Sequence, residues 1–216
     1  MCHRLPLWLI LCAVPASCFD VVYGSGVSKT EARPVEEFHA VRLEGFGNLL
    51  LKVGEPAALV ITGDDNLVAM VKTRVEQGTL VIGIEQDVSK SRGKLEFAVS
   101  TPRLDALQMR GAGAADVQGL TGAAFDARLS GAGSLVATGA VDHLTLQLSG
   151  AGAARLYALK AKAADLSLAG VGSAQVSVSE HLKVRLSGVG SVTYRGDPKV
   201  EQEIGGIGRI ARDDGR

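Results

Sequence analysis

Apolar and polar residues alternate along the C-terminal half of the chain in six short stretches, each of which ends at a Gly-x-Gly pair. The residues two and four positions before the first glycine are mostly apolar, and the residue between them is polar. A period of two is typical of a β-strand with one buried face. The pattern therefore predicts strands whose outward side chains are Gln108, Arg128, Gln147, Ser167, Arg185 and Glu203.

The Gly-x-Gly pairs recur every 18 to 20 residues, which is the self-similarity of a solenoid. The predicted fold class is all-β, a right-handed parallel β-helix or β-solenoid with coils of that length. Each coil must turn a corner, where glycine permits a positive φ or a close backbone approach. The predicted corner glycines are Gly111, Gly113, Gly131, Gly133, Gly150, Gly152, Gly170, Gly172, Gly188 and Gly190, with related pairs at Gly45/Gly47 and Gly206/Gly208.

The N-terminal half is less regular, but it carries the same alternation. Strands are predicted within residues 38–55, 57–63, 78–85 and 94–100. The segment that begins at Asp64 places apolar residues at helical spacing and predicts a short helix near 65–71. We expect 35–105 to form irregular opening coils and a cap, 106–210 to form the regular repeats of the same single domain, 19–34 to be a linker and 211–216 a polar tail.

Residues 1–18 have the features of a signal peptide: a basic start, an apolar run from Leu5 to Val14, and small residues before Cys18. Two kinds of processing remain open, acylation of Cys18 as in a lipoprotein, or ordinary cleavage near Ala16 or Cys18. All three cysteines lie in this segment. The mature chain is therefore expected to contain no disulfide and no cysteine nucleophile or ligand.

The charge balance argues against two classes of partner. The chain carries 23 basic and 23 acidic residues, with a sequence pI near 6.9. A nucleic-acid-binding protein normally has a clear basic excess, so no nucleic acid is expected. No polybasic membrane patch is present, and membrane attachment is expected only through a lipid on Cys18.

Several candidate chemistries fail on spacing. His143 and His181 lie at equivalent positions two coils apart, too far to share a zinc ion. The glycine pairs lack the third glycine and the helix of a nucleotide-binding loop. The aspartates at 105, 126, 142 and 165 do not form one column, so no paired carboxylates are predicted. The expectation is a protein without enzymatic activity, cofactor or metal.

The chain resembles a bacterial family, the "putative auto-transporter adhesin, head GIN domain". The resemblance rests on "YGSGVSKTEARPVEEFHAVRLEGFGNLLLKVG", "VITGDDNL", "GTLVIGI" and the serial "LSGAGS" corners, in that order, and covers about residues 23–210. It implies an exported β-helical domain, in some members anchored by a lipid. It implies no catalytic residues.

The functional expectation is an exported, non-enzymatic envelope or cell-surface module in the periplasm, at the outer membrane or on the cell surface. It would bind or adhere through an outward sheet face, with Arg128, Gln147, Ser167 and Arg185 as the candidate residues and a polysaccharide or envelope component as partner. A self-associating structural protein, hence a homo-oligomer, is the alternative. A polysaccharide-processing β-helix enzyme is a weaker one.

Overall fold

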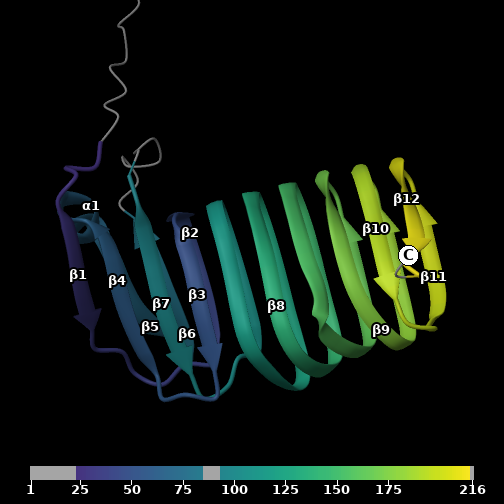
Figure 1. Ribbon diagram of the computed structural model, residues 1–216, viewed down its shortest axis with the longest axis horizontal. Helices are drawn as coiled ribbons and strands as arrows, with labels where there is room; N and C mark the ends of the chain where they lie inside the picture. The colour runs from purple at the N-terminus through teal and green to yellow at the C-terminus, as the bar shows by residue number, and fades with distance from the viewer. Residues whose placement is uncertain (1–22, 85–92, 215–216) are drawn as a thin grey trace, which may run out of the picture.

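The computed structural model describes residues 23–84 and 93–214 (Figure 1). The predicted signal peptide and Cys18 lie outside these residues. The expectation of an all-β fold is confirmed, because one curled, open, 12-stranded sheet accompanies a single short helix among the described residues. In chain order the elements are β1 (Ser28–Arg33), β2 (Ala40–Phe46), β3 (Asn48–Val53), β4 (Ala58–Asp64), α1 (Asp65–Met70), β5 (Val71–Glu76), β6 (Thr79–Ile84), β7 (Leu95–Thr101), β8 (Ala106–Leu168), β9 (Val171–Leu186), β10 (Val189–Arg195), β11 (Lys199–Ile204) and β12 (Ile207–Arg212).

The curl has two limbs. We call the strand segments before each glycine pair the first limb and the segments after it the second limb. β8 and β9 run through both limbs, and successive repeats pair in parallel. The pairing keeps equivalent residues in register, as in Val171, Val189 and Ile207 of the second limb. Residues that pair across neighbouring strands are therefore one sequence repeat apart.

The N-terminal end of the sheet departs from this parallel scheme. β1 pairs with β4, β4 with β7, and β5 with β6, all antiparallel. Residues 28–33 form β1, so the interval 19–34 is not simply the linker that was expected. β5 was not predicted either. Both are edge strands rich in charged residues. β1 contains a single apolar residue, Ala32, and the alternation of Val71, Thr73 and Val75 in β5 follows directly on the apolar spacing of the predicted helix.

The helix predicted near 65–71 is confirmed as α1, which buries Leu67 and Val68. Arg33 of β1 donates hydrogen bonds to the carbonyl oxygens of Val71 (2.5 Å) and Val68 (3.1 Å). Because β1 and β5 are the N-terminal edges of the two limbs, this guanidinium ties the limbs together where the sheet begins.

One hydrophobic core fills the space between the limbs. Alternate residues of the first limb are buried, for example Leu146, Leu166 and Val184, which lie in register in successive repeats. The second limb contributes Leu135, Ala154 and other residues to the same cluster. Leucine, valine and alanine thus form ladders along the inner face of the sheet.

The glycines of the repeats stack into two columns, one for each glycine of the pair. A Cβ atom added at Gly150 would lie less than 3.0 Å from the carbonyl oxygen of Gly131, and one added at Gly188 equally close to that of Gly170. At the same corners, the N–H of Val189 donates to the carbonyl oxygen of Gly170 at 2.8 Å. Close approach of backbone to backbone is therefore the shared requirement of the columns.

Fewer corner glycines have a positive φ than the corner prediction suggested. Of the ten predicted corner glycines, φ lies between +135° and +155° only at Gly111, Gly113, Gly131 and Gly150. The residue between the glycines points away from the core, with Val171 exposed by 63%, Val189 by 48% and Ile207 by 75%. The inside-outside alternation keeps its phase through the corner, since buried Leu168 and buried Ala174 are six residues apart and Val171 falls on the outward side.

Leu168→Ala is expected to lower the free energy of unfolding by about 2–5 kcal/mol through lost burial and the cavity that remains. Leu168 is exposed by only 2%. The matched control is Ser149→Ala on the exposed side of the same limb, which should cost little. Urea denaturation distinguishes the two, and equal losses would contradict the observed orientation of the side chains.

Gly188→Ala is expected to cost about 1–3 kcal/mol because the new methyl group meets a backbone carbonyl that cannot move without shifting its strand. Gly188 has no left-handed φ, so the effect isolates the close approach. Gly83→Ala is the control, since a Cβ there meets nothing within 4 Å. If both variants unfold at the wild-type denaturant concentration, the glycine columns do not limit the packing of the repeats.

Candidate binding surface

The outer face of the first limb presents an exposed polar row that crosses every repeat. Direct register places Arg42 beside Gln108, and Ser167 beside Arg185, which lies beside Glu203. The remaining members each lie three residues before a stacked glycine and so continue the row. In spatial order the row is Arg42, Gln108, Arg128, Gln147, Ser167, Arg185 and Glu203. The four candidate residues Arg128, Gln147, Ser167 and Arg185 are thus neighbours on one face.

The arginines of this row are held by neighbouring polar groups. The Nε of Arg42 donates to Oε1 of Gln108 at 2.9 Å, and Arg128 makes two hydrogen bonds to Asp126, at 2.8 and 3.1 Å. Arg185 pairs with Glu203 at 3.4 Å. The side chains of Arg128 and Arg185 remain exposed by 53% and 58%. They are therefore ordered, and their remaining donors face solvent.

A shallow hollow of about 180 Å³ lies at the N-terminal part of the row, lined by Arg42, Gln108, Asp126 and Arg128 among others. It is open, and its lining mixes these polar side chains with apolar ones such as Ala40 and Ala106. Its guanidinium and amide groups can bond hydroxyl or carboxylate groups of a ligand laid over the strands.

The aspartates and histidines near the strand starts form separate pairs rather than one cluster. Asp105 pairs with His39 at 3.2 Å, Asp142 with Lys162 at 2.7 Å, and Asp165 with His143 at 3.1 Å. The hydrogen bond that Lys162 donates to the carboxylate of Asp142 raises the pKa of Lys162 above its usual value. Register places His181 beside Ala163, so Ala163 separates His181 from His143 as the sequence spacing indicates. Among the described residues, no three His, Cys, Asp or Glu side chains are placed to share a metal ion.

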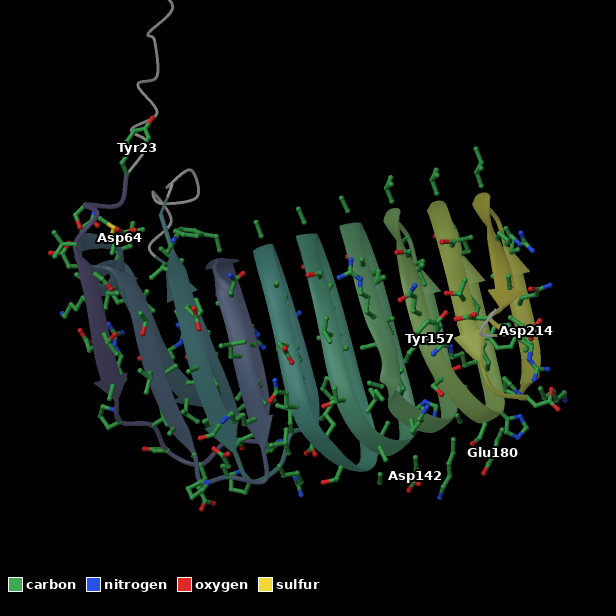
Figure 2. The ribbon with its side chains drawn as sticks, in the orientation of Figure 1. Tyr23, Asp64, Asp142, Tyr157, Glu180 and Asp214 are labelled. Atoms are coloured by element: carbon green, nitrogen blue, oxygen red, sulfur yellow. The ribbon has the colours of Figure 1, made fainter. Side chains whose placement is uncertain are left out.

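A larger hollow of about 580 Å³ follows the bends opposite the glycine corners. It is lined by Asp142, Lys160, Lys162, Ser177 and Asp197, among others. Figure 2 shows Asp142 and Glu180 at these bends. Lys160 donates to the hydroxyl of Ser177 at 3.2 Å, and Lys162 is engaged by Asp142. Asp197 pairs with Arg212 at 3.0 Å, so the charged side chains of this hollow all have polar partners.

A third hollow, of about 410 Å³, lies on the outer face of the second limb and was not foreseen from the sequence. The hydroxyl of Tyr157 bonds that of Thr193 at 2.9 Å, and the guanidinium of Arg195 lies 4.1 Å from the centre of the Tyr157 ring. Arg195 also pairs with Asp213 at 2.9 Å. Tyr157 lies at the start of a bulge between Leu156 and Lys160, where the pairing register shifts. In the sequence this bulge is visible only as a slightly longer spacing between two glycine pairs.

Two of the motifs that carry the family resemblance contact each other at the N-terminal end. The carboxylate of Asp64 accepts hydrogen bonds from the backbone N–H groups of Gly26 (2.9 Å) and Lys94 (3.1 Å). The side chain of Asn66 donates to the carbonyl oxygen of Tyr23 at 2.8 Å. "VITGDDNL" therefore fixes "YGSG" to the end of the sheet, near the Tyr23 and Asp64 labels in Figure 2.

Burial raises the pKa of the Tyr157 phenol above its usual value of 10.0, and Asp213 adds to the effect. Tyr157 therefore ionises later in the folded chain than in the unfolded chain. The stability that this difference contributes is present below about pH 10 and falls as the pH rises through the raised pKa.

The tyrosinate absorbance of the wild type and of Tyr157→Phe is measured as the pH is raised, and the second curve is subtracted from the first. The difference is expected to show one step above pH 10. A difference step at or below the ordinary pKa would show that the ring is not packed as described. Retained cooperative unfolding of the variant serves as the control for its fold.

The sequence profile of the family described as "Putative auto-transporter adhesin, head GIN domain" matches residues 37–198. The chain belongs to this family. The resemblance inferred from the motifs is therefore correct, and the family name points to a domain of the cell surface. A search of curated proteins finds no match.

Solved structures share the fold over nearly the whole chain. A crystal structure of a "putative adhesin" from Bacteroides fragilis has 25% identity and a TM-score of 0.72, covering 89% of this chain and 100% of its own. A "putative adhesin" from Parabacteroides merdae has 21% identity and a TM-score of 0.55, covering 90% and 100%. A "putative lipid binding protein" from Parabacteroides distasonis has 18% identity, a TM-score of 0.56 and the same coverage. None of these names describes an enzyme.

Within the described part of the chain, no helix has the length and apolarity needed to cross a membrane.

Proposed function

We propose that this protein is an exported, non-enzymatic binding module of the bacterial cell surface, and that its curled sheet is a right-handed β-solenoid. In this proposal the outer face of the first limb binds an extended, polar polymer such as a surface polysaccharide. The family membership and the fold shared with the Bacteroides fragilis protein support an adhesive role. Processing of residues 1–18 would deliver the domain to the envelope, with a lipid on Cys18 as one mode of attachment.

The observation that carries the proposal is the polar row itself. Its members recur on neighbouring strands, and neighbouring strands lie about 4.8 Å apart. Arginine, glutamine and serine side chains thus offer hydrogen-bond donors and acceptors at a constant interval along the length of the molecule. An extended polymer laid across the strands meets an equivalent group at each step.

The arrangement of the carboxylates supports binding over catalysis. Asp105, Asp142 and Asp165 each pair with a different basic side chain, and Asp126 is held by Arg128 of its own strand. Hydrolysis of a glycosidic bond requires two carboxyl groups that face one bond. We therefore propose that the row binds its ligand without changing it chemically.

The expected result on an array of polysaccharides and envelope glycans is specific, saturable binding by the mature chain, residues 19–216. Arg128→Ala combined with Arg185→Ala should weaken that binding at least about tenfold, because two ordered, charged donors are lost. Arg155→Ala, which removes an exposed arginine from the second limb, is the matched control and should bind as the wild type does.

Loss of binding in the control as well would assign the effect to charge in general rather than to this face. An array without any bound glycan would contradict the proposal. A reducing-end assay on each bound glycan tests the non-enzymatic part, since released sugar would overturn it.

A further inference from the structure

The two limbs end in strands whose outer edges have no partner. Within the described residues β5 pairs only with β6, and β11 pairs only with β9. These strands are the two ends of the first limb, at opposite ends of the molecule (Figure 1). An unpaired strand edge presents N–H and C=O groups that can bind another strand.

Strand direction determines how two copies can meet. β6, β2, β9 and β11 run parallel within the first limb, through β8, whereas β5 runs antiparallel to β6. A second copy placed along the same axis therefore brings its β5 antiparallel to β11. Antiparallel pairing is the more stable arrangement per residue.

The side chains of the two strands are complementary in one antiparallel register. Their outward residues match basic to acidic in all three pairs, which are Lys199–Glu76, Glu201–Arg74 and Glu203–Lys72. Their inward residues match apolar to apolar and polar to polar, in the pairs Val200–Val75, Gln202–Thr73 and Ile204–Val71. A shift of two residues in either direction leaves one opposite-charge pair and creates one like-charge pair, so the charges favour the register with three opposite-charge pairs.

The residues involved are accessible in the single chain. Ile204 is exposed by 45%, and Arg74 and Glu76 by 51% and 54%. Arg74 and Glu76 pair with each other at 2.6 Å, and Glu203 pairs with Arg185 at 3.4 Å. These exposed intrachain pairs can extend into networks across the contact without leaving a charge unpaired.

We propose that β11 of one copy pairs with β5 of the next, so that the protein assembles head to tail through its own sheet. The contact is heterologous: each copy uses one end and leaves the other free. Such a contact generates open chains of molecules rather than a closed dimer.

The test is sedimentation velocity on the mature chain, residues 19–216, and on charge-reversal variants. The wild type is expected to show a concentration-dependent series of species that shrinks at high salt. Glu201→Arg alone and Arg74→Glu alone should each weaken association about tenfold, because one attraction becomes a repulsion. The double variant Arg74→Glu/Glu201→Arg should recover association.

Lys52→Glu, in the middle strand β3, is the matched control and should assemble as the wild type does. Far-UV circular dichroism verifies that each variant is folded. A wild type that stays monomeric at every soluble concentration overturns the proposal. So do single reversals that assemble normally, or a double variant that does not recover.

A second measurement does not depend on charge. The mature chain is expected to contain no cysteine of its own, so Arg74→Cys and Glu201→Cys chains can be mixed and oxidised. Disulfide-linked pairs should form between the two variants and not within either one alone. Equal cross-linking by Lys52→Cys chains would show that the contact is random collision.

Discussion

The close approach of backbone to backbone at the corners is the constraint on which the rest of the structure depends. Strands of neighbouring repeats can pair in register only if the chain turns at the same height in every repeat. The turn brings two backbones too near for a Cβ atom, as at Gly188 over Gly170. Glycine at these positions permits the hydrogen bonds between repeats. The leucine ladders and the outward polar row then follow from the alternation along each strand.

The same constraint connects the fold with the proposed role. In-register stacking converts one polar position in each repeat into a continuous row on the surface. No single repeat contains a site, but the stack presents a regular row that runs from Arg42 in β2 to Glu203 in β11. This organisation suits recognition of a repeating polymer better than chemistry at one bond, which requires several groups to converge. The carboxylates of Asp105, Asp142 and Asp165 each have a different basic side chain as partner.

Much of the architecture was predictable from the sequence because the repeat encodes both strand and corner. The alternation identified the strands around Leu146 and Leu166, and the spacing of the glycines placed the polar row in register. The helix at Asp65–Met70 was predictable from its apolar spacing. β1 and β5 were not, because β1 contains only one apolar residue and the alternation of β5 begins at Val71, which the helical spacing had already taken up. Tyr157 was missed since its position depends on a bulge, which pairing creates and local sequence does not reveal.

Removal of one complete repeat tests the stacking account most directly. Deleting residues 150–169 joins Ser149 to Gly170 and brings the next glycine pair into the place of the missing one. Because each repeat contacts chiefly its neighbours, the shortened chain should fold into the same sheet and unfold cooperatively, with somewhat lower stability. Deletion of only residues 150–159 should abolish folding, because it moves every later residue out of register. An unfolded chain after the full-repeat deletion, or a folded one after the half-repeat deletion, would contradict the account.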